Sequence, residues 1–337
     1  MDEKWDSLVL KFRKLGGIAD NVCQKNGEFG RGIFSIDPNI RSRIFIPSKL
    51  MVAKDDIYLE GNQLRIKKEA EYSAEVRDFF NYYQDNFSWG GGGKEIVESF
   101  EKGLSLFSSN LKKLLRECMV VDIQKRHRGL WEEVILGEFL RARAFRFNKL
   151  LMICPILELV NHDVISLPFN KYLDGISTPN YPPIKGEIIH NYNSKSPLNR
   201  FFYQGFFCKE SIVFSFPFSL NLKSLGINFV CLGNQLQDDA MKIEKFPNKI
   251  CVKGLPIAAV NNPRLPSAYF DELRRNINQL NFPENILIEI IDINISIRKK
   301  ISEESKSVNN EVSNMLSKVI NYEMNLISSC DYNNIHQ

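Results

Sequence analysis

The chain has 337 residues, enough for two domains and a large buried core, so its stability does not require a disulfide framework or a structural metal. Its 44 basic and 40 acidic residues leave a formal charge of +4, which is too small for this length to indicate nucleic-acid or membrane binding.

The seven cysteines occur singly, with no Cys-x-x-Cys spacing, which favours free thiols in a reducing compartment over disulfides or a zinc site. The first residues lack the basic flank and apolar run of a secretory signal, and no stretch approaches the roughly 20 apolar residues of a membrane span. We therefore expect a soluble cytoplasmic protein with no metal.

Apolar residues at helical spacing predict a short opening helix over residues 5–15. Two β-type runs, 26–36 and 44–47, are separated by turn residues and predict a hairpin or meander. Gly30 and Gly32 fall in the first run, where they would let the backbone approach a ligand closely. A bare Gly-x-Gly is more often a plain turn, so this pair alone does not indicate a cofactor loop.

Helical periodicity dominates residues 60–140. The run Gly90–Gly93 interrupts it, and we expect a mobile surface loop there because glycine is a poor helix former. The run lacks the Gly-Lys-Ser/Thr ending of a phosphate loop.

Four adjacent apolar residues, 150–153, predict a buried strand, and Pro155 ends it. Apolar residues at 156, 157 and 160 then fit one helical turn, which would hold Glu158 and Asn161 on one face as a polar pair. His162 follows directly.

The second half of the chain begins with a short strand over 186–193 that ends in polar residues. An aromatic block over 199–206 and a strand over 212–218 come next. From about residue 233 to the end we expect helices, whose isoleucine-rich stripes indicate the core of a helical domain.

Taken in order, these segments resemble a SET-domain methyltransferase of the Rubisco large-subunit lysine methyltransferase branch. The resemblance rests on the early Gly-x-Gly turn, Arg-Ala-Phe at 143–145, Pro-x-x-Glu-x-x-Asn-His at 155–162, the strand ending in Tyr192, and Tyr-Gln-Gly-Phe at 203–206.

The resemblance implies an α+β fold: small curved β-sheets with a threaded C-terminal segment, a helical insertion at about 62–140 and an all-α C-terminal domain. The SET domain would cover residues 1–232, and a substrate-binding-like helical domain would cover 233–337.

The resemblance also implies S-adenosylmethionine as the cofactor. The backbone around Glu28, Gly30, Arg31 and Gly32 would hold its amino-acid part, Arg143 would face its carboxylate, and Glu158, Asn161 and His162 would contact its ammonium and adenine regions. Tyr192 would be the catalytic tyrosine beside the cofactor, and Phe145 and Tyr203 would line the channel for the target side chain.

These residue types suit the chemistry. A guanidinium matches a carboxylate, and oxygen acceptors match an ammonium. Methyl transfer to an amine depends mainly on positioning a neutral nucleophile, and an apolar aromatic channel disfavours the charged form of a lysine. No covalent intermediate is required.

Two departures leave alternatives open. Asn191-Tyr192-Asn193 stands where the family often has Ser-Tyr-Gly, and Gln204 interrupts a Tyr-Gly-Phe motif. The leading hypothesis is a protein lysine methyltransferase, and the lack of a cysteine-rich zinc-binding extension favours a non-histone substrate. The alternatives are a catalytically weak or inactive protein-binding module and a protein histidine methyltransferase.

Overall fold

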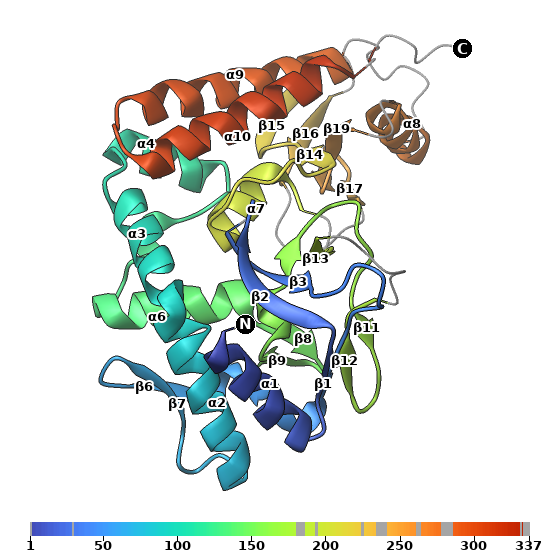
Figure 1. Ribbon diagram of the computed structural model, residues 1–337. Coiled ribbons are helices and arrows are strands. Elements are labelled where there is room, and N and C mark those ends of the chain that lie inside the picture. The colour runs from blue at the N-terminus through green and yellow to red at the C-terminus, as the bar shows by residue number, and fades with distance from the viewer. Residues whose placement is uncertain are drawn as a thin grey trace. The chain divides into compact units, whose positions relative to one another are not determined.

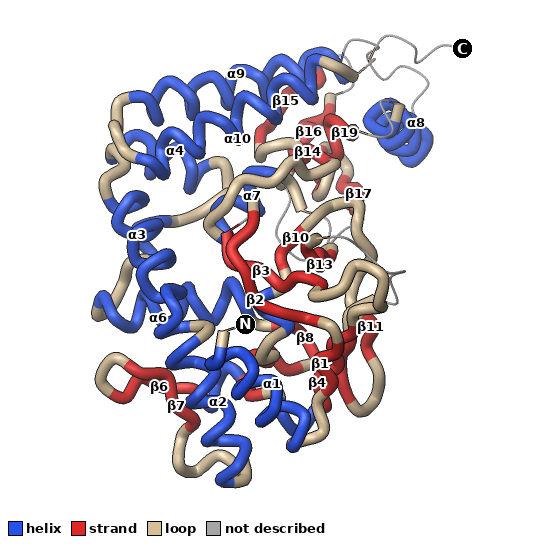
Figure 2. The backbone as a smooth tube through the Cα atoms, viewed as in Figure 1, coloured by secondary structure: helices blue, strands red, loops and turns tan. Residues whose placement is uncertain are grey.

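The computed structural model describes residues 2–28, 30–179, 186–192, 195–223, 226–233, 241–260, 264–277, 286–330 and 332. Helices and several small sheets alternate along the chain, so the predicted α+β class is confirmed (Figures 1 and 2). The described residues form two compact units. Unit 1 contains residues 1–99 and 130–193, and unit 2 contains residues 100–129 and 194–337. The predicted domains, 1–232 and 233–337, are based on the family resemblance, whereas the two units are defined by how compactly their residues pack. The predicted domain boundary stays a prediction.

Unit 1 is built from four small sheets, with strand orders β1-β4-β12-β11, β10-β13-β3-β2, β5-β9-β8 and β6-β7. Its strands are β1 (Ile18–Asp20), β2 (Val22–Gly27), β3 (Gly30–Ser35), β4 (Arg43–Pro47), β5 (Val52–Ala53), β6 (Ile57–Glu60), β7 (Gln63–Ile66), β8 (Phe145–Phe147), β9 (Leu150–Ile153), β10 (Asn161–His162), β11 (Asn170–Lys171), β12 (Gly175–Ser177) and β13 (Glu187–His190).

The sheet β10-β13-β3-β2 joins distant parts of the sequence. β2 and β3 form a hairpin in which Gly27 pairs with Gly30, and β13 lies antiparallel to β3. The expected pairing of 26–36 with 44–47 is wrong, because residues 44–47 belong to β4, which pairs with β1 and β12 in another sheet. β10 runs parallel to β13, pairing Asn161 with Ile189 and His162 with His190. This sheet therefore brings the Gly-x-Gly and Asn-His segments to one place.

Helices α1 (Glu3–Lys14), α2 (Ala74–Asn86) and α6 (Trp131–Arg143) cover the sheets of unit 1, and α3 (Lys94–Ser105) begins in it. The predicted opening helix is present; it is capped by Asp2 and buries Trp5, Leu8 and Phe12. The helical character expected after about residue 62 is also present, although β7 lies at its start.

The glycine run differs from the loop that we expected. Trp89–Gly93 forms a π-type turn that leads directly into α3, and its conformation is accommodated by positive φ at Gly92 (+97°). Glycine is a poor helix former, but here it allows a wide turn to join two helices.

The segment 150–162 also differs in detail. β9 is a strand, but Leu150 is 57% exposed and Leu151 40% exposed, so its first half is not buried. The expected helical turn is a short 3-10 turn, Leu157–Leu159, after which Asn161 and His162 enter β10. Glu158 and Asn161 therefore do not share a helix face, because pairing with β13 extends the backbone at Asn161.

Unit 2 contains two sheets, β14-β19 and β15-β16-β18-β17, and most of the long helices. Its strands are β14 (Ile212–Phe214), β15 (Phe218–Leu222), β16 (Ile227–Cys231), β17 (Lys242–Phe246), β18 (Lys249–Lys253) and β19 (Pro256–Ala259). Its helices are α4 (Ser109–Glu117), α5 (Ile123–Arg126), α7 (Pro197–Gln204), α8 (Leu265–Ile277), α9 (Ile286–Lys306) and α10 (Glu311–Ser328), together with the second half of α3.

The expectation of an all-helical segment from residue 233 onward is wrong over 242–259, which forms β17, β18 and β19, and it holds for α8, α9 and α10. The run Lys249–Lys253 alternates too little to be recognised as a strand because Ile250, Cys251 and Val252 are all buried. β17 is mostly exposed and carries charged residues, so it has no apolar face to identify it.

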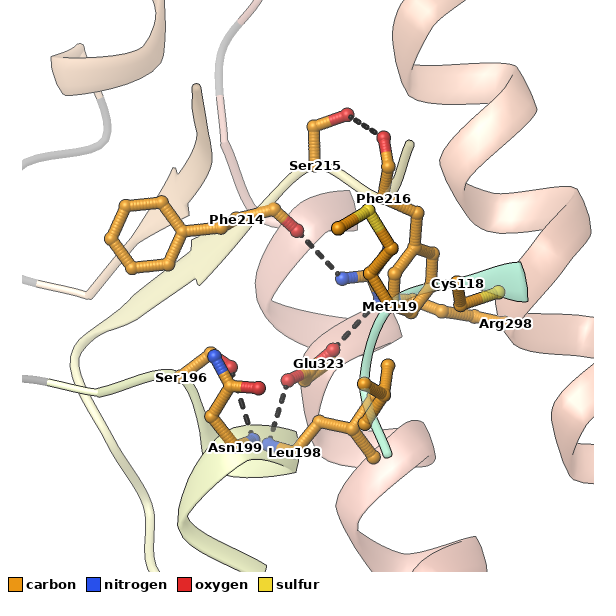
Figure 3. Close-up of a pocket in the computed structure, with 11 residues that line it drawn as sticks. Cys118, Met119, Ser196, Leu198, Asn199, Phe214, Ser215, Phe216, Arg298 and Glu323 are labelled. Atoms are coloured by element: carbon orange, nitrogen blue, oxygen red, sulfur yellow. Dashed lines mark hydrogen bonds and ion pairs between the residues drawn. The ribbon is translucent and has the colours of Figure 1, made fainter. Parts of the chain in front are cut away.

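A buried ion pair joins the two longest helices of unit 2. Arg298 Nε on α9 lies 2.9 Å from Glu323 Oε2 on α10, and both side chains are at most 1% exposed. Glu323 Oε1 accepts a hydrogen bond from the backbone N–H of Leu198 at 3.0 Å, and Arg298 donates to the carbonyl of Phe214 at 3.1 Å (Figure 3). A cavity of about 20 Å³ beside this pair has room for one water molecule.

The seven cysteines form no disulfide among the described residues, and six of them are buried. Across the described residues, no helix combines the length and apolar character that crossing a bilayer requires.

Candidate functional site

The turn of the β2–β3 hairpin is shaped by glycine. Gly30 has a φ of +86°, which a residue with a side chain would adopt only with strain. Gly32 faces the neighbouring strand so closely that an added Cβ would lie 2.0 Å from Glu187 Oε1 and 2.8 Å from Asn161 Nδ2. The second glycine of the motif therefore makes room for a polar pair inside unit 1.

Asn161 ties the hairpin to β13. Its Nδ2 donates to the backbone carbonyl of Arg31 at 3.0 Å and to Glu187 Oε1 at 2.6 Å. Burial raises the pKa of Glu187, the bond from Asn161 opposes that rise, and the charge of Glu28 adds to it. Glu28 itself is exposed at the hairpin tip, so it acts on the site through charge.

Replacing Gly32 by alanine should lower the free energy of unfolding by about 1–3 kcal/mol, because the new methyl group would separate Asn161 from Glu187. Chemical denaturation measures the change. Gly137→Ala is the matched control: its Cβ would meet nothing within 4 Å, and it lies inside α6, where alanine is the better helix former. An equal effect of the two substitutions would contradict the close contact at Gly32.

Glu158 belongs to unit 1 and is 9% exposed. Its Oε1 accepts hydrogen bonds from the hydroxyl of Tyr83, at 2.8 Å, and from that of Ser88. Its Oε2 is buried and has no hydrogen-bond partner among the described residues. A buried carboxylate oxygen without a partner is uncommon in folded proteins and indicates a position for a further donor.

Two arginines give the region its charge. Burial raises the pKa of Glu158, while the charge of Arg143, the two hydroxyl hydrogen bonds and the charge of Arg31 oppose the rise. Burial also lowers the pKa of Arg31, and the charge of Arg143 lowers it further. Arg31 Nη1 donates to the carbonyl of Phe87 at 2.9 Å, and the guanidinium of Arg143 lies 4.2 Å from the centre of the Phe139 ring.

Tyr192 is held at both ends by the segment 160–162. Its hydroxyl donates to the carbonyl of Val160 at 2.6 Å, and its backbone N–H donates to His162 Nδ1 at 3.0 Å. His162 Nδ1 also lies 3.2 Å from the backbone carbonyl of His190, so the ring contacts β13 as well as Tyr192. His162 thus fixes the backbone that carries Tyr192.

A row of rings runs from Phe145 to Tyr192. The Phe145 and Phe169 rings are 5.5 Å apart, Phe169 stacks on His190 at 3.4 Å, and His190 lies 5.5 Å from Tyr192. His190 Nδ1 donates to the carbonyl of Leu167 at 3.1 Å, since a carbonyl can only accept. The row connects Phe145 on β8 to Tyr192 through Phe169 and His190, which are both buried.

The hydrogen bonds, ring contacts and charge interactions of unit 1 connect most of the site residues expected from the sequence, namely Glu28, Arg31, Gly32, Arg143, Phe145, Glu158, Asn161, His162 and Tyr192, with Gly30 at the hairpin turn. Tyr203 belongs to unit 2, on α7, where Lys195 Nζ lies 3.4 Å from the centre of its ring.

Several residues were missed by sequence reasoning: Tyr83, Ser88, Phe169, Glu187 and His190. No motif marks them. Only for Glu187 was there a signal, an acidic residue at the start of a strand that is otherwise apolar.

No family model matches the sequence, and a search of characterised proteins finds no match either. Among solved structures, the chain is similar to the SET domain of LSMT bound to lysine and AdoHcy, with 14% identity and a TM-score of 0.40 over 98% of this chain and 90% of that one. It is also similar to Rubisco LSMT bound to sinefungin and monomethyllysine, with 14% identity and a TM-score of 0.41 over 97% of this chain and 90% of that one.

Proposed function

We propose that this protein is a SET-type methyltransferase that transfers a methyl group from S-adenosylmethionine to a lysine of another, non-histone protein. The observation that carries the proposal is the hydrogen-bonded assembly in unit 1, where Asn161 binds the carbonyl of Arg31 inside the Gly-x-Gly motif and His162 binds the backbone of Tyr192. These are the segments that a SET-type site requires, and they are far apart in the sequence.

The polar side chains of this region suit the charged groups of S-adenosylmethionine. The unpartnered Oε2 of Glu158 is suited to an ammonium, which carries three donors, and Arg143 is suited to a carboxylate. The backbone of Gly30 to Gly32 would lie along the amino-acid part, and Asn161 and His162 would lie near the adenine region. When bound, the cofactor supplies an electrophilic methyl group on a sulfonium.

The chain's own residues would prepare the nucleophile. An amine must be neutral to attack, and the ring row of Phe145, Phe169 and His190 offers an apolar surface that disfavours a charged lysine. The Tyr192 hydroxyl donates to Val160, and its oxygen is of the type that makes weak C–H contacts with a sulfonium methyl group. Positioning of this kind is the main contribution that the protein makes to an in-line displacement.

Calorimetry with S-adenosylmethionine and transfer of a labelled methyl group to proteins of a cell lysate test the proposal. We expect binding, and labelling of at least one protein at a lysine, as identified by fragmentation of the product. Label on a histidine would instead support a histidine methyltransferase. Failure to bind at millimolar cofactor would refute both.

Replacing Tyr192 by phenylalanine should reduce the labelling rate by about tenfold or more, because it removes the hydroxyl that is proposed to contact the methyl group and that bonds Val160. Tyr172→Phe is the control, since Tyr172 is exposed and packs edge-on against Phe45. Equal rates for the two variants would remove Tyr192 from the mechanism.

A second function, a SET-like module that binds a protein without methylating it, is favoured by one observation. The ring face of Tyr203 carries the chain's own ammonium, from Lys195 at 3.4 Å, where a target-channel ring would be expected to face a target lysine. Cofactor binding without labelling of any lysate protein would support this reading.

A further inference from the structure

The carboxyl group of Glu158 is held asymmetrically. Two hydroxyl donors, from Tyr83 and Ser88, converge on Oε1, while Oε2 has no hydrogen-bond partner in the described part of the chain. A carboxylate that is free to rotate would exchange its two oxygens, so two donors on one oxygen fix which of them stays available.

The two donors come from one end of α2 and the turn that follows it. Tyr83 is on the last turn of α2 and is fully buried. Burial raises its pKa well above the ordinary value, and the charge of Glu158 raises it further, so the phenol keeps its proton at neutral pH. Ser88 is 1% exposed and lies immediately before the turn Trp89–Gly93. Neither hydroxyl is positioned to bond water in place of Glu158.

The absence of a side chain at Gly91 allows Arg31 to lie close to the turn that carries Ser88. An added Cβ on Gly91 would lie 2.6 Å from Arg31 Nη1 and 2.8 Å from the carbonyl of Asn86. The same Arg31 nitrogen donates to the carbonyl of Phe87. A larger residue at position 91 would therefore displace Arg31 or open the turn that presents Ser88.

We propose that Tyr83 and Ser88 are positioning residues of the cofactor site, which hold Glu158 by Oε1 so that Oε2 faces the cofactor ammonium, and that Gly91 admits Arg31 beside them. The inference rests on the proposed function and deepens it. The helical segment 74–93 then completes the cofactor wall that the SET-type motifs begin.

The test compares Ser88→Ala and Tyr83→Phe with wild type by calorimetric titration of S-adenosylmethionine from about pH 4.5 to 7, where carboxyl groups titrate. Each variant should bind about tenfold more weakly, since a hydrogen bond to a charged group is lost. The pH midpoint of binding should also move upward, because each lost donor had stabilised the ionised carboxylate.

The charged and titratable groups around Glu158 in unit 1 are Arg31 on β3, Tyr83 on α2, Arg143 on α6 and Cys154 after β9. Burial raises the pKa of Cys154, with Glu158 adding to the rise, and that of Tyr83 is also raised, so neither loses a proton in this range. Carbon-13 NMR of glutamate-labelled protein, with the Glu158 signal identified from Glu158→Gln, reads the same upward shift in unliganded Ser88→Ala.

Ser88→Thr, which keeps the hydroxyl, should restore both the affinity and the pH midpoint. Tyr72→Phe and Ser73→Ala are matched controls: Tyr72 bonds Asp56 and the backbone of Ala53, and Ser73 caps α2, so both change stability without touching Glu158. They should leave the pH midpoint unchanged.

The outcomes separate the two proposals. If wild type binds the cofactor but Ser88→Ala and Tyr83→Phe bind with the same affinity and pH midpoint, the positioning role is overturned and the proposed function stands. If wild type does not bind the cofactor at all, the proposed function fails and this inference fails with it.

Discussion

Replacing Glu323 by alanine should lower the free energy of unfolding by about 3–5 kcal/mol, because it leaves the guanidinium of Arg298 buried without a counter-charge. The substitution also removes the acceptor for the backbone N–H of Leu198. Arg298 would keep its bonds to Asn294 and to the carbonyl of Phe214, but these neutral acceptors do not balance a full charge in the interior. Urea denaturation followed by circular dichroism measures the loss.

Two comparisons make this prediction specific. The double variant Arg298→Met/Glu323→Leu should be far closer to wild type, because apolar residues of similar size remove the charge along with its partner. Glu117→Ala breaks the exposed pair with Lys113 on α4, at 3.8 Å, and should change the free energy by about 0.5 kcal/mol at most. A loss for Glu323→Ala no greater than that for Glu117→Ala would show that the buried pair does not stabilise the protein.

The same ion pair shows which buried residues the periodicity of apolar residues does not predict. The apolar stripe of α9 includes Ile286, Ile290, Ile293 and Ile297, yet Asn294 and Arg298 are among its buried residues, while Ile293 and Ile297 are only partly buried. Periodicity identifies the helix because most of its buried residues are apolar. It does not identify buried polar residues, because the partners of Asn294 and Arg298 lie on β14, in the segment just after it and on α10.

The candidate site also contains some residues that the sequence predicts and others that it does not. The Gly-x-Gly turn and the short strand before Tyr192 were predictable from turn and strand patterns, although 26–36 was expected to pair with 44–47 and instead contains the turn of the 22–35 hairpin. Ser88 was not, since its only mark in the sequence is a place beside a glycine run that indicates a loop. Its role arises from the contact with Glu158, 70 residues later in the chain.

Glu158→Gln should have opposite effects on stability and on cofactor binding. Burial raises the folded-state pKa of Glu158 above its unfolded value of about 4.3, despite Arg143 and the two hydroxyl donors. The folded state therefore binds the extra proton, and wild-type stability falls as the pH rises from the unfolded pKa through the folded pKa. A glutamine does not ionise, so the stability of Glu158→Gln relative to wild type should increase with pH over that window.

Glu101 in unit 2 is the matched control, since it is also a buried glutamate. Burial acts to raise its pKa, but the hydrogen bond with His127 and the charge of Arg126 outweigh burial, and the net pKa is lowered. The stabilisation by ionised Glu101 is present above its unfolded pKa and is lost as the pH falls through its folded pKa. Glu101→Gln should therefore destabilise the protein most at neutral pH, opposite in sign to Glu158→Gln.

Glu158→Gln should also weaken the binding of the cofactor. Glu158→Gln places a neutral amide where an ionised oxygen would meet the cofactor ammonium, and S-adenosylmethionine should bind about 10- to 100-fold more weakly at neutral pH. A residue that reduces stability when ionised and is nonetheless surrounded by two hydroxyl donors and two arginines is best explained by a requirement of binding. Thermal unfolding and calorimetry of the same samples test both halves. A variant less stable than wild type at pH 8 that binds the cofactor equally well would assign Glu158 to the core alone.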